Sequence, residues 1–100
     1  MAKRNFSMHP HGTFYSKSSE GAQYLDNTSG HDKKDDSVPP GAIHKYEWFV
    51  NAENTPKEGD DKCIPWVYHS HVVPGKDINT GTVGMCQLIK VIISYAILVP

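Results

Sequence analysis

Prolines and glycines interrupt this chain so often that no long helix fits between them. Seven prolines and eight glycines are spread over 100 residues, and each favours a turn or the end of an element. The stretches between them are rich in aromatic and β-branched residues, which favour strands. The pattern predicts strands at residues 4–15, 42–50 and 63–73, joined by polar loops. It therefore indicates an all-β domain, either a β-sandwich or a barrel.

The composition is that of a soluble globular domain with no preference for nucleic acid. Ten Lys and Arg residues oppose 11 Asp and Glu residues, and 38% of the chain is hydrophobic. Such a balance provides no basic face, so nucleic acid is not an expected partner. The first residues lack the apolar core of a signal peptide. The protein is thus either intracellular or part of a longer chain.

The last residues differ from the rest of the chain. From residue 88 to 99 only Lys90 and Ser94 are polar. The run is too short to span a bilayer, which needs about 20 residues. Its β-branched residues favour a buried strand over a truncated membrane segment or an aggregation-prone end.

Two His-x-His triplets, "HPH" at 9–11 and "HSH" at 69–71, are the first candidate functional residues. Residues i and i+2 of a strand point to the same face, roughly 6.5–7 Å apart. If the two strands are neighbours, four imidazoles gather on one patch, and neutral imidazole binds copper, zinc, iron or nickel. The spacing favours ligands shared among adjacent ions. One such triplet is more often an ordinary surface pair, so the pattern alone leaves both interpretations open.

Further segments resemble a known family. In chain order they are "FSMHPHG", "SEGAQYLDNTSG", "DDSVPPG", "CIPWVYHSHV" and "KDINTG". Together, over residues 3–84, they resemble the first cupredoxin-like domain of the ceruloplasmin- and hephaestin-type multicopper ferroxidases. The resemblance implies an incomplete cupredoxin-like Greek-key β-sandwich or barrel, with N-terminal strands missing and an atypical C-terminus. It divides the chain into a partial plastocyanin-like domain, 1–84, and an apolar tail outside the family, 85–100.

In that family a trinuclear copper cluster, lying between the first and last domains, reduces dioxygen to water with electrons from ferrous iron. The resemblance implies that His9 is a ligand of the type 2 copper. It implies that His11, His69 and His71 are ligands of the type 3 pair. Four imidazoles are half of the cluster, and the last cupredoxin domain supplies the rest. The sequence also lacks the Cys-His-Met set of a type 1 copper. The chain is thus expected to be a ferroxidase fragment that is inactive alone.

The resemblance assigns two more sites. Glu20 occupies the position of an acidic residue beside the cluster, where a carboxylate can relay protons; otherwise Glu20 is a loop residue before a turn glycine. The loop "HDKKDDS" implies a calcium site made by Asp32, Asp35, Asp36 and the backbone carbonyl of Lys17, because calcium prefers oxygen ligands. A solvated acidic loop is the alternative.

The resemblance also implies a location and a disulfide. Asn27 lies in the sequon "NTS", where the family is often glycosylated. This fits a secreted protein or the outer face of the plasma membrane. Cys63 matches a family cysteine that forms a disulfide within the domain. Cys86 stands three residues before the expected partner, so the pairing of Cys63 with Cys86 is left open.

Two other functions compete with the ferroxidase fragment. One is a non-catalytic module that binds calcium and protein partners, like the A domains of the blood-clotting cofactors. The presence of all four histidines argues against it, because a pure binding module does not need them. The other is an independent zinc-binding β-domain, which predicts tight stoichiometric zinc in the isolated chain.

Overall fold

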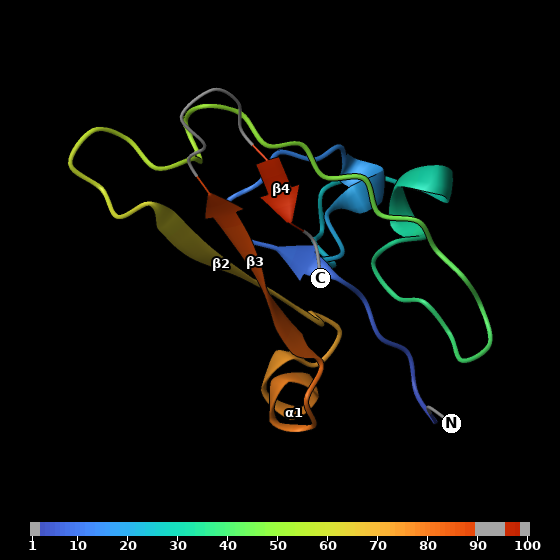
Figure 1. The fold of residues 1–100 in the computed structure, drawn as a ribbon. Coiled ribbons are helices and arrows are strands. Elements are labelled where there is room, and N and C mark those ends of the chain that lie inside the picture. Colours follow the sequence, from blue (N-terminus) through green and yellow to red (C-terminus); the bar gives the residue numbers. More distant parts are fainter. Residues whose placement is uncertain (1–2, 90–95, 99–100) are drawn as a thin grey trace.

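The computed structural model describes residues 3–89 and 96–98. Its main feature is a four-stranded antiparallel sheet in the order β1-β2-β3-β4 (Figure 1). The strands are β1 (His9–Pro10), β2 (Cys63–His69), β3 (Val83–Ile89) and β4 (Ala96–Leu98). The helices are α1 (Pro74–Asn79) and two short 3₁₀ helices, η1 (Lys17–Ser19) and η2 (Gly30–Lys33).

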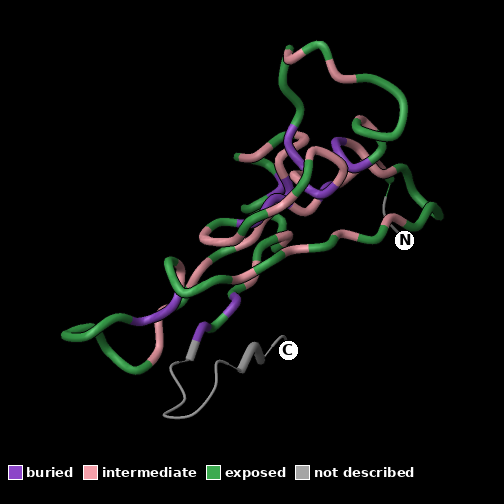
Figure 2. The backbone as a smooth tube through the Cα atoms, turned by 90° about the horizontal axis from the view of Figure 1, so that it is seen from above, coloured by how far each residue is buried: buried purple, intermediate pink, exposed green. Residues whose placement is uncertain are grey.

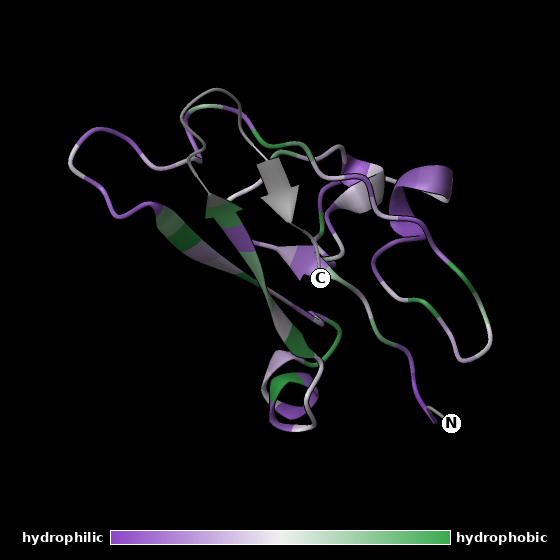
Figure 3. Cartoon of the chain, in the orientation of Figure 1, coloured by the Kyte–Doolittle hydropathy of each residue, from purple (hydrophilic) through white to green (hydrophobic). Residues whose placement is uncertain are grey.

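Strands β2 and β3 form the longest pair, and their two faces differ. The register runs from Cys63 opposite Ile89 to His69 opposite Val83. Cys86 and Leu88 are buried on one face, whereas Val67 and Met85 are exposed on the other. Figure 3 shows hydrophobic residues along both strands and hydrophilic residues in most loops. The pair therefore provides the apolar part of the fold and holds "HSH" at one end.

The core of the described residues is small and unusually polar. Its buried hydrophobic residues are Ala22, Cys86 and Leu88, and its buried polar residues are Ser7, His9, Ser19, Asp35, Asp36, Thr55, Ser70 and Asp77. Buried segments are short and lie between long exposed loops (Figure 2). The radius of gyration is 15.0 Å, whereas a compact chain of this length has about 13 Å. The structure is an open antiparallel sheet, which confirms the predicted incomplete all-β cupredoxin-like fragment.

The three predicted strands have different outcomes. The strand predicted at 63–73 is present as β2, but it ends at His69. The one predicted at 4–15 is reduced to β1. Residues 42–50 alternate between exposed and partly buried from residue 44 onward, as a strand would, but they form only the single bridge Phe14–Phe49. In the described part of the chain this segment has no continuous neighbour with which to form a ladder.

The apolar end of the chain contributes two strands. β3 runs from Val83 to Ile89 and crosses the predicted boundary after residue 84 without interruption, and β4 follows at Ala96–Leu98. Leu88 is fully buried. The rest of the predicted buried strand, at 90–95 and 99, lies outside the described residues.

Helix α1 was not predicted from the sequence. Pro74 stands in its first turn, a position that proline favours because its missing N–H has no helical partner there. The glycine that follows and the shortness of the helix hide this signal. α1 matters because it brings Asp77 into the interior, where its side chain is 0% exposed.

The two cysteines are free thiols in the structure. Cys86 pairs with Trp66 in the β2–β3 register, so these two side chains share a face. Cys63 is three residues from Trp66, and an odd separation along a strand reverses the face. Cys63 and Cys86 thus lie on opposite faces, and this register does not allow a disulfide between them.

Gly12, directly after the "HPH" triplet, packs against Trp66. Its φ is +70°, and a Cβ at this position would lie 2.0 Å from Trp66 Cδ2. Gly30 has a similar φ of +60° but no atom within 4 Å of such a Cβ. We expect Gly12→Ala to lower the free energy of unfolding by about 2–4 kcal/mol, from overpacking and backbone strain together. Urea unfolding followed by tryptophan fluorescence measures this loss.

Gly30→Ala is the matched control, because it introduces the backbone strain without the clash. Its expected loss is about 1 kcal/mol. Equal losses in the two variants would show that Trp66 does not pack on Gly12.

Candidate metal centre

The structure brings the four triplet histidines together. β1 and β2 pair antiparallel with His9 opposite His69. The His9 ring centroid lies 5.1 Å from that of His11, 5.7 Å from His69 and 5.1 Å from His71. His69 and His71 stack at 5.7 Å. The four imidazoles are therefore gathered as expected for two His-x-His triplets on neighbouring strands.

Backbone carbonyls orient two of the rings. His9 Nδ1 lies 2.7 Å from the Glu20 carbonyl oxygen, and His69 Nδ1 lies 2.9 Å from that of Ser70. A carbonyl only accepts, so in both rings Nδ1 carries the proton. The Nε2 lone pair of each ring then faces away from its carbonyl partner, and that of His69 accepts a hydrogen bond from His11 Nε2, which a metal ion would replace. Such outer hydrogen bonds to backbone carbonyls are typical of metal-binding histidines.

The ring environment favours the neutral form of His9 and His11. Burial lowers the pKa of His9 below its usual value, and the neighbouring imidazoles lower it further, although the bond to the Glu20 carbonyl opposes this. Burial and the charges of His69 and His71 likewise lower the pKa of His11. The neutral form is the one that binds a metal ion. His9 and His11 are therefore disposed toward metal binding near neutral pH.

The imidazole donors and their spacing fit copper ions that each bind some of the four rings. His11 Nε2 lies 3.0 Å from His69 Nε2, and a metal–imidazole bond is about 2.0–2.1 Å long in zinc sites, so one ion can bind both nitrogens. Imidazole is a ligand that copper accepts well. Within the described residues, no group of three or more His, Cys, Asp or Glu side chains has the arrangement of a site for one metal ion.

Glu20 is next to the cluster through its backbone, and its carboxylate points elsewhere. Glu20 Oε2 lies 2.5 Å from Lys17 Nζ, which also contacts Asp26 at 2.6 Å. Tyr15 is near His9 and within the electrostatic influence of Glu20. Its ring centroid is 6.1 Å from that of His9, and its pKa is raised by burial and then by the Glu20 charge. The structure places Glu20 near the imidazoles but pairs its carboxylate with a lysine.

The carboxylates of the predicted calcium ligand set differ in burial and in their partners. Asp35 is 0% exposed and Asp36 is 5% exposed. Asp35 Oδ2 accepts a hydrogen bond from the Gly21 N–H at 2.7 Å, whereas its buried Oδ1 has no hydrogen-bond partner. Asp36 Oδ2 lies 3.2 Å from Lys33 Nζ, without hydrogen-bond alignment. Asp32 is about half exposed and lies 3.7 Å from His31 Nδ1.

Two lysines and one further carboxylate complete this acidic region. Lys33 Nζ contacts Asp26 at 3.2 Å as well as Asp36. Lys17 approaches the region through its side chain. The hydrogen bond from Lys17, followed by those from Thr28, holds the pKa of Asp26 well below its usual range. Burial, opposed by Lys33 and assisted by Asp35, raises the pKa of Asp36. Asp26 was not predicted, because it lies outside the "HDKKDDS" cluster.

Sequence reasoning also missed Ser7, Ser70 and Asp77. Ser70 Oγ donates to Asp77 Oδ2 at 2.7 Å, and all three residues are buried. Burial alone would raise the pKa of Asp77, but hydrogen bonds from Ser70 and Val73 and the charge of Arg4 lower it. Asp77 is thus a buried carboxylate acceptor. Of these three residues, only Ser70, the serine inside "HSH", lies within one of the two histidine triplets.

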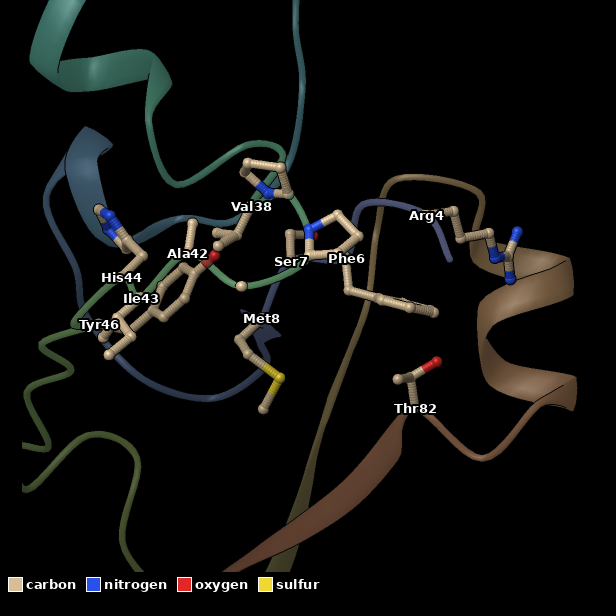
Figure 4. A pocket seen from close by; sticks show the side chains of 13 residues that line it. Arg4, Phe6, Ser7, Met8, Val38, Ala42, Ile43, His44, Tyr46 and Thr82 are labelled. Atoms are coloured by element: carbon tan, nitrogen blue, oxygen red, sulfur yellow. The ribbon is translucent and has the colours of Figure 1, made fainter. Parts of the chain in front are cut away.

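Two other features are exposed or separate from the imidazoles. Asn27 is exposed and has a φ of +61°, so its sequon is accessible. A groove of about 430 Å³ lies between the N-terminal segment and residues 38–46, and apolar side chains such as Phe6 and Ile43 line it (Figure 4). None of the four triplet histidines lines this groove. Among the described helices, none is long and apolar enough to cross a membrane.

Comparison with known proteins identifies relatives that fit this site. The chain is 54% identical over 89 residues to Ferroxidase HEPHL1 of Mus musculus, and 49% identical over 83 residues to hephaestin of Homo sapiens. These matches cover 89% and 83% of the chain. It is also 42% identical over 89 residues to coagulation factor V of Pseudonaja textilis.

The chain spans 8% of the length of Ferroxidase HEPHL1, 7% of hephaestin and 6% of the coagulation factor. No protein-family profile matches it. The chain therefore belongs to the family of the hephaestin-type ferroxidases, which are multicopper oxidases, and represents a partial domain of that family.

Proposed function

We propose that this chain contributes half of the ligands of a trinuclear copper cluster in a multicopper ferroxidase. The observation that carries the proposal is the convergence of His9, His11, His69 and His71, in which five of the six pairs of ring centroids lie 5.1–5.7 Å apart. Bound copper would supply the redox chemistry that reduces dioxygen with electrons from ferrous iron. The similarity to the ferroxidases supports this assignment.

The residue roles follow the resemblance. His9 binds the type 2 copper, and His11, His69 and His71 bind the type 3 pair. The 3.0 Å separation of His11 Nε2 and His69 Nε2 supports a shared ion for these two. Glu20 relays protons once its carboxylate is released from Lys17. A last cupredoxin domain supplies the remaining ligands.

The proposed location is extracellular, either secreted or at the outer face of the plasma membrane. The exposed sequon at Asn27 supports it, because N-glycosylation takes place in the secretory pathway.

The competing function is a non-catalytic module that binds calcium and partners. The similarity to coagulation factor V favours it, although the chain is more similar to the ferroxidases. Copper binding at the imidazoles separates the two, because a module of that kind does not require it.

Copper binding by histidines inside and outside the cluster can be compared in the same chain, because two of its six histidines lie outside the cluster. We expect the full chain to bind Cu²⁺ at pH 7.5 with nitrogen hyperfine structure in its paramagnetic resonance spectrum. His69→Ala should weaken binding by more than the about 10–100-fold that loss of an outer hydrogen-bond partner costs. Equilibrium dialysis measures the affinity.

His31→Ala is the control, because His31 is exposed and its Nδ1 lies 3.7 Å from Asp32 Oδ1, away from the cluster of the four triplet histidines. It should leave both affinity and spectrum unchanged. Equal losses in the two variants would mean that copper binds histidines at random over the surface.

A second prediction concerns activity. Half of a ligand set leaves bound ions open to solvent, and the sequence contains no type 1 site through which electrons enter. The full chain loaded with copper should therefore oxidise ferrous iron no faster than the same concentration of free copper. Dioxygen uptake in an iron-containing buffer measures the rate, and turnover above free copper would contradict the half-site assignment.

We further propose a calcium site at the acidic region, formed by Asp32, Asp35, Asp36 and the backbone carbonyl of Lys17. The buried Oδ1 of Asp35, which has no hydrogen-bond partner, is the observation that favours it. A buried unpartnered carboxylate oxygen is costly, and a calcium ion would satisfy it. The Lys33 ammonium beside Asp36 would then be displaced.

Calorimetric titration with calcium chloride tests this site. Asp35→Asn should weaken binding by at least tenfold, because removing a charged ligand lowers the affinity of oxygen sites for calcium. Asp61→Asn, in an exposed loop, should change nothing. Absence of heat at millimolar calcium, or the same affinity in both variants, would favour a solvated acidic loop.

A further inference from the structure

The pairing of the two histidine triplets continues beyond the strands through hydroxyl groups. In the β1–β2 register His9 stands opposite His69 and Pro10 opposite Tyr68, so two residues earlier Ser7 stands opposite His71. At this level Ser7 N–H donates to Ser70 Oγ at 3.2 Å, and His71 N–H donates to Ser7 Oγ at 3.0 Å. Serine side chains therefore replace the carbonyl acceptors of an ordinary ladder.

This hydroxyl pair is buried and anchored at both ends. Ser70 is 0% exposed and Ser7 is 3% exposed. Ser7 Oγ donates to the Gly21 carbonyl at 2.6 Å. Ser70 Oγ donates to Asp77 Oδ2, which also accepts the Val73 N–H at 2.9 Å. The resulting network of hydrogen bonds, Asp77–Ser70–Ser7–Gly21, links the segment before β1 to the segment after β2.

Helix α1 holds the Asp77 end of this network in place. Arg4 Nη2 lies 2.5 Å from Asp77 Oδ1, and Figure 4 shows the Arg4 side chain reaching toward the helix. The Asp77 carbonyl accepts hydrogen bonds from the side chains of Thr80 and Thr82. Since Asp77 is 0% exposed, water cannot take over these contacts.

This hydrogen-bond network influences the positions of the histidine rings because Ser70 lies between two of them in the sequence. Ser70 is between His69 and His71, so its side chain points away from theirs where the backbone is extended. Fixing Ser70 in the interior therefore directs both rings to the opposite side. The bond from His71 N–H to Ser7 places that residue beside β1, where its ring lies 5.1 Å from the His9 ring.

We propose that Asp77, Ser70 and Ser7 are positioning residues, which hold the two triplets opposite each other and so set the geometry of the four imidazoles. The metal-binding consequence rests on the copper site proposed above, whereas ring placement is a property of the metal-free chain. None of the three side chains needs to touch a metal ion.

The test compares a variant that loses a hydroxyl belonging to the hydrogen-bond network with a variant that loses a buried hydroxyl outside the network. Ser70→Ala removes the central hydroxyl. Thr55→Ala is the matched control, because Thr55 is 4% exposed and its Oγ1 bonds only locally, to the Ala52 carbonyl at 3.1 Å. Circular dichroism establishes the temperature at which each full-length variant is folded. Proton cross-relaxation between histidine rings is then measured by NMR without metal, and copper spectra are recorded afterwards.

We expect Ser70→Ala to abolish ring–ring cross-peaks between His9 and His71, while Thr55→Ala retains them. In the copper-loaded chain, Ser70→Ala should weaken affinity about tenfold and change the nitrogen hyperfine pattern. If Ser70→Ala does not fold, Asp77→Asn replaces it, since the amide keeps an oxygen acceptor but loses the charge. Weaker His9–His71 cross-peaks in that variant are the expected result.

Unchanged cross-peaks in Ser70→Ala or Asp77→Asn would overturn the positioning role. Loss of the cross-peaks in Thr55→Ala as well would also overturn it, because any buried hydroxyl would then matter equally. If the unmodified chain binds no copper through imidazole nitrogen, the copper site fails, and the metal-free cross-peaks still decide the positioning role by themselves.

Discussion

The antiparallel pairing of His9 with His69 is the contact on which the site depends. His11 and His69 are 58 residues apart, so closing the intervening loop has an entropic cost that grows with its length. The ladder consists of two residue pairs and is extended by the His11 N–H bond to the Val67 carbonyl. By itself it offsets little of this entropic cost. The packing of Trp66 on Gly12 and the buried hydroxyl bonds of Ser7 and Ser70 supply the rest. Several of the buried polar residues therefore lie close to the short pairing of β1 with β2.

The imidazole cluster could be predicted because alternate residues of a strand share a face. The residues that hold it in place could not, because their roles depend on tertiary contacts. The i, i+2 rule places His9 with His11 and His69 with His71 without any structure, and the family resemblance indicated that the two strands are neighbours. The roles of Ser7 and Asp77 depend on which residues stand opposite them across the sheet. Residues 42–50 alternate as expected, yet a strand needs a partner as well as a pattern. The sequence of that segment contains no information on whether the partner is present.

The acidic region shows how burial and charge compete within a few residues. Asp26, which is partly exposed, binds Lys17 and Lys33 and remains ionised. Asp36 is buried beside Asp35, and its pKa rises despite the lysine next to it. The density of carboxylates in "HDKKDDS" indicates cation binding, but only the fold distinguishes the buried oxygens from the solvated ones. A bound divalent cation and the two ammonium groups are alternative ways to balance the same charges.

The electrostatics of the histidine cluster argue for a ligand rather than for a purely structural role. Burial and then the neighbouring imidazoles lower the pKa values of His9 and His11, so the folded chain resists protonation at these rings. For a group whose folded pKa is depressed below its unfolded value, protonation favours the unfolded state. Stability from the cluster is thus retained above the unfolded pKa of histidine, about 6.5, and decreases as the pH falls below it. Apolar side chains at these positions would avoid this penalty. A metal ion bound to the ring nitrogens would instead make use of the close packing of the four imidazoles.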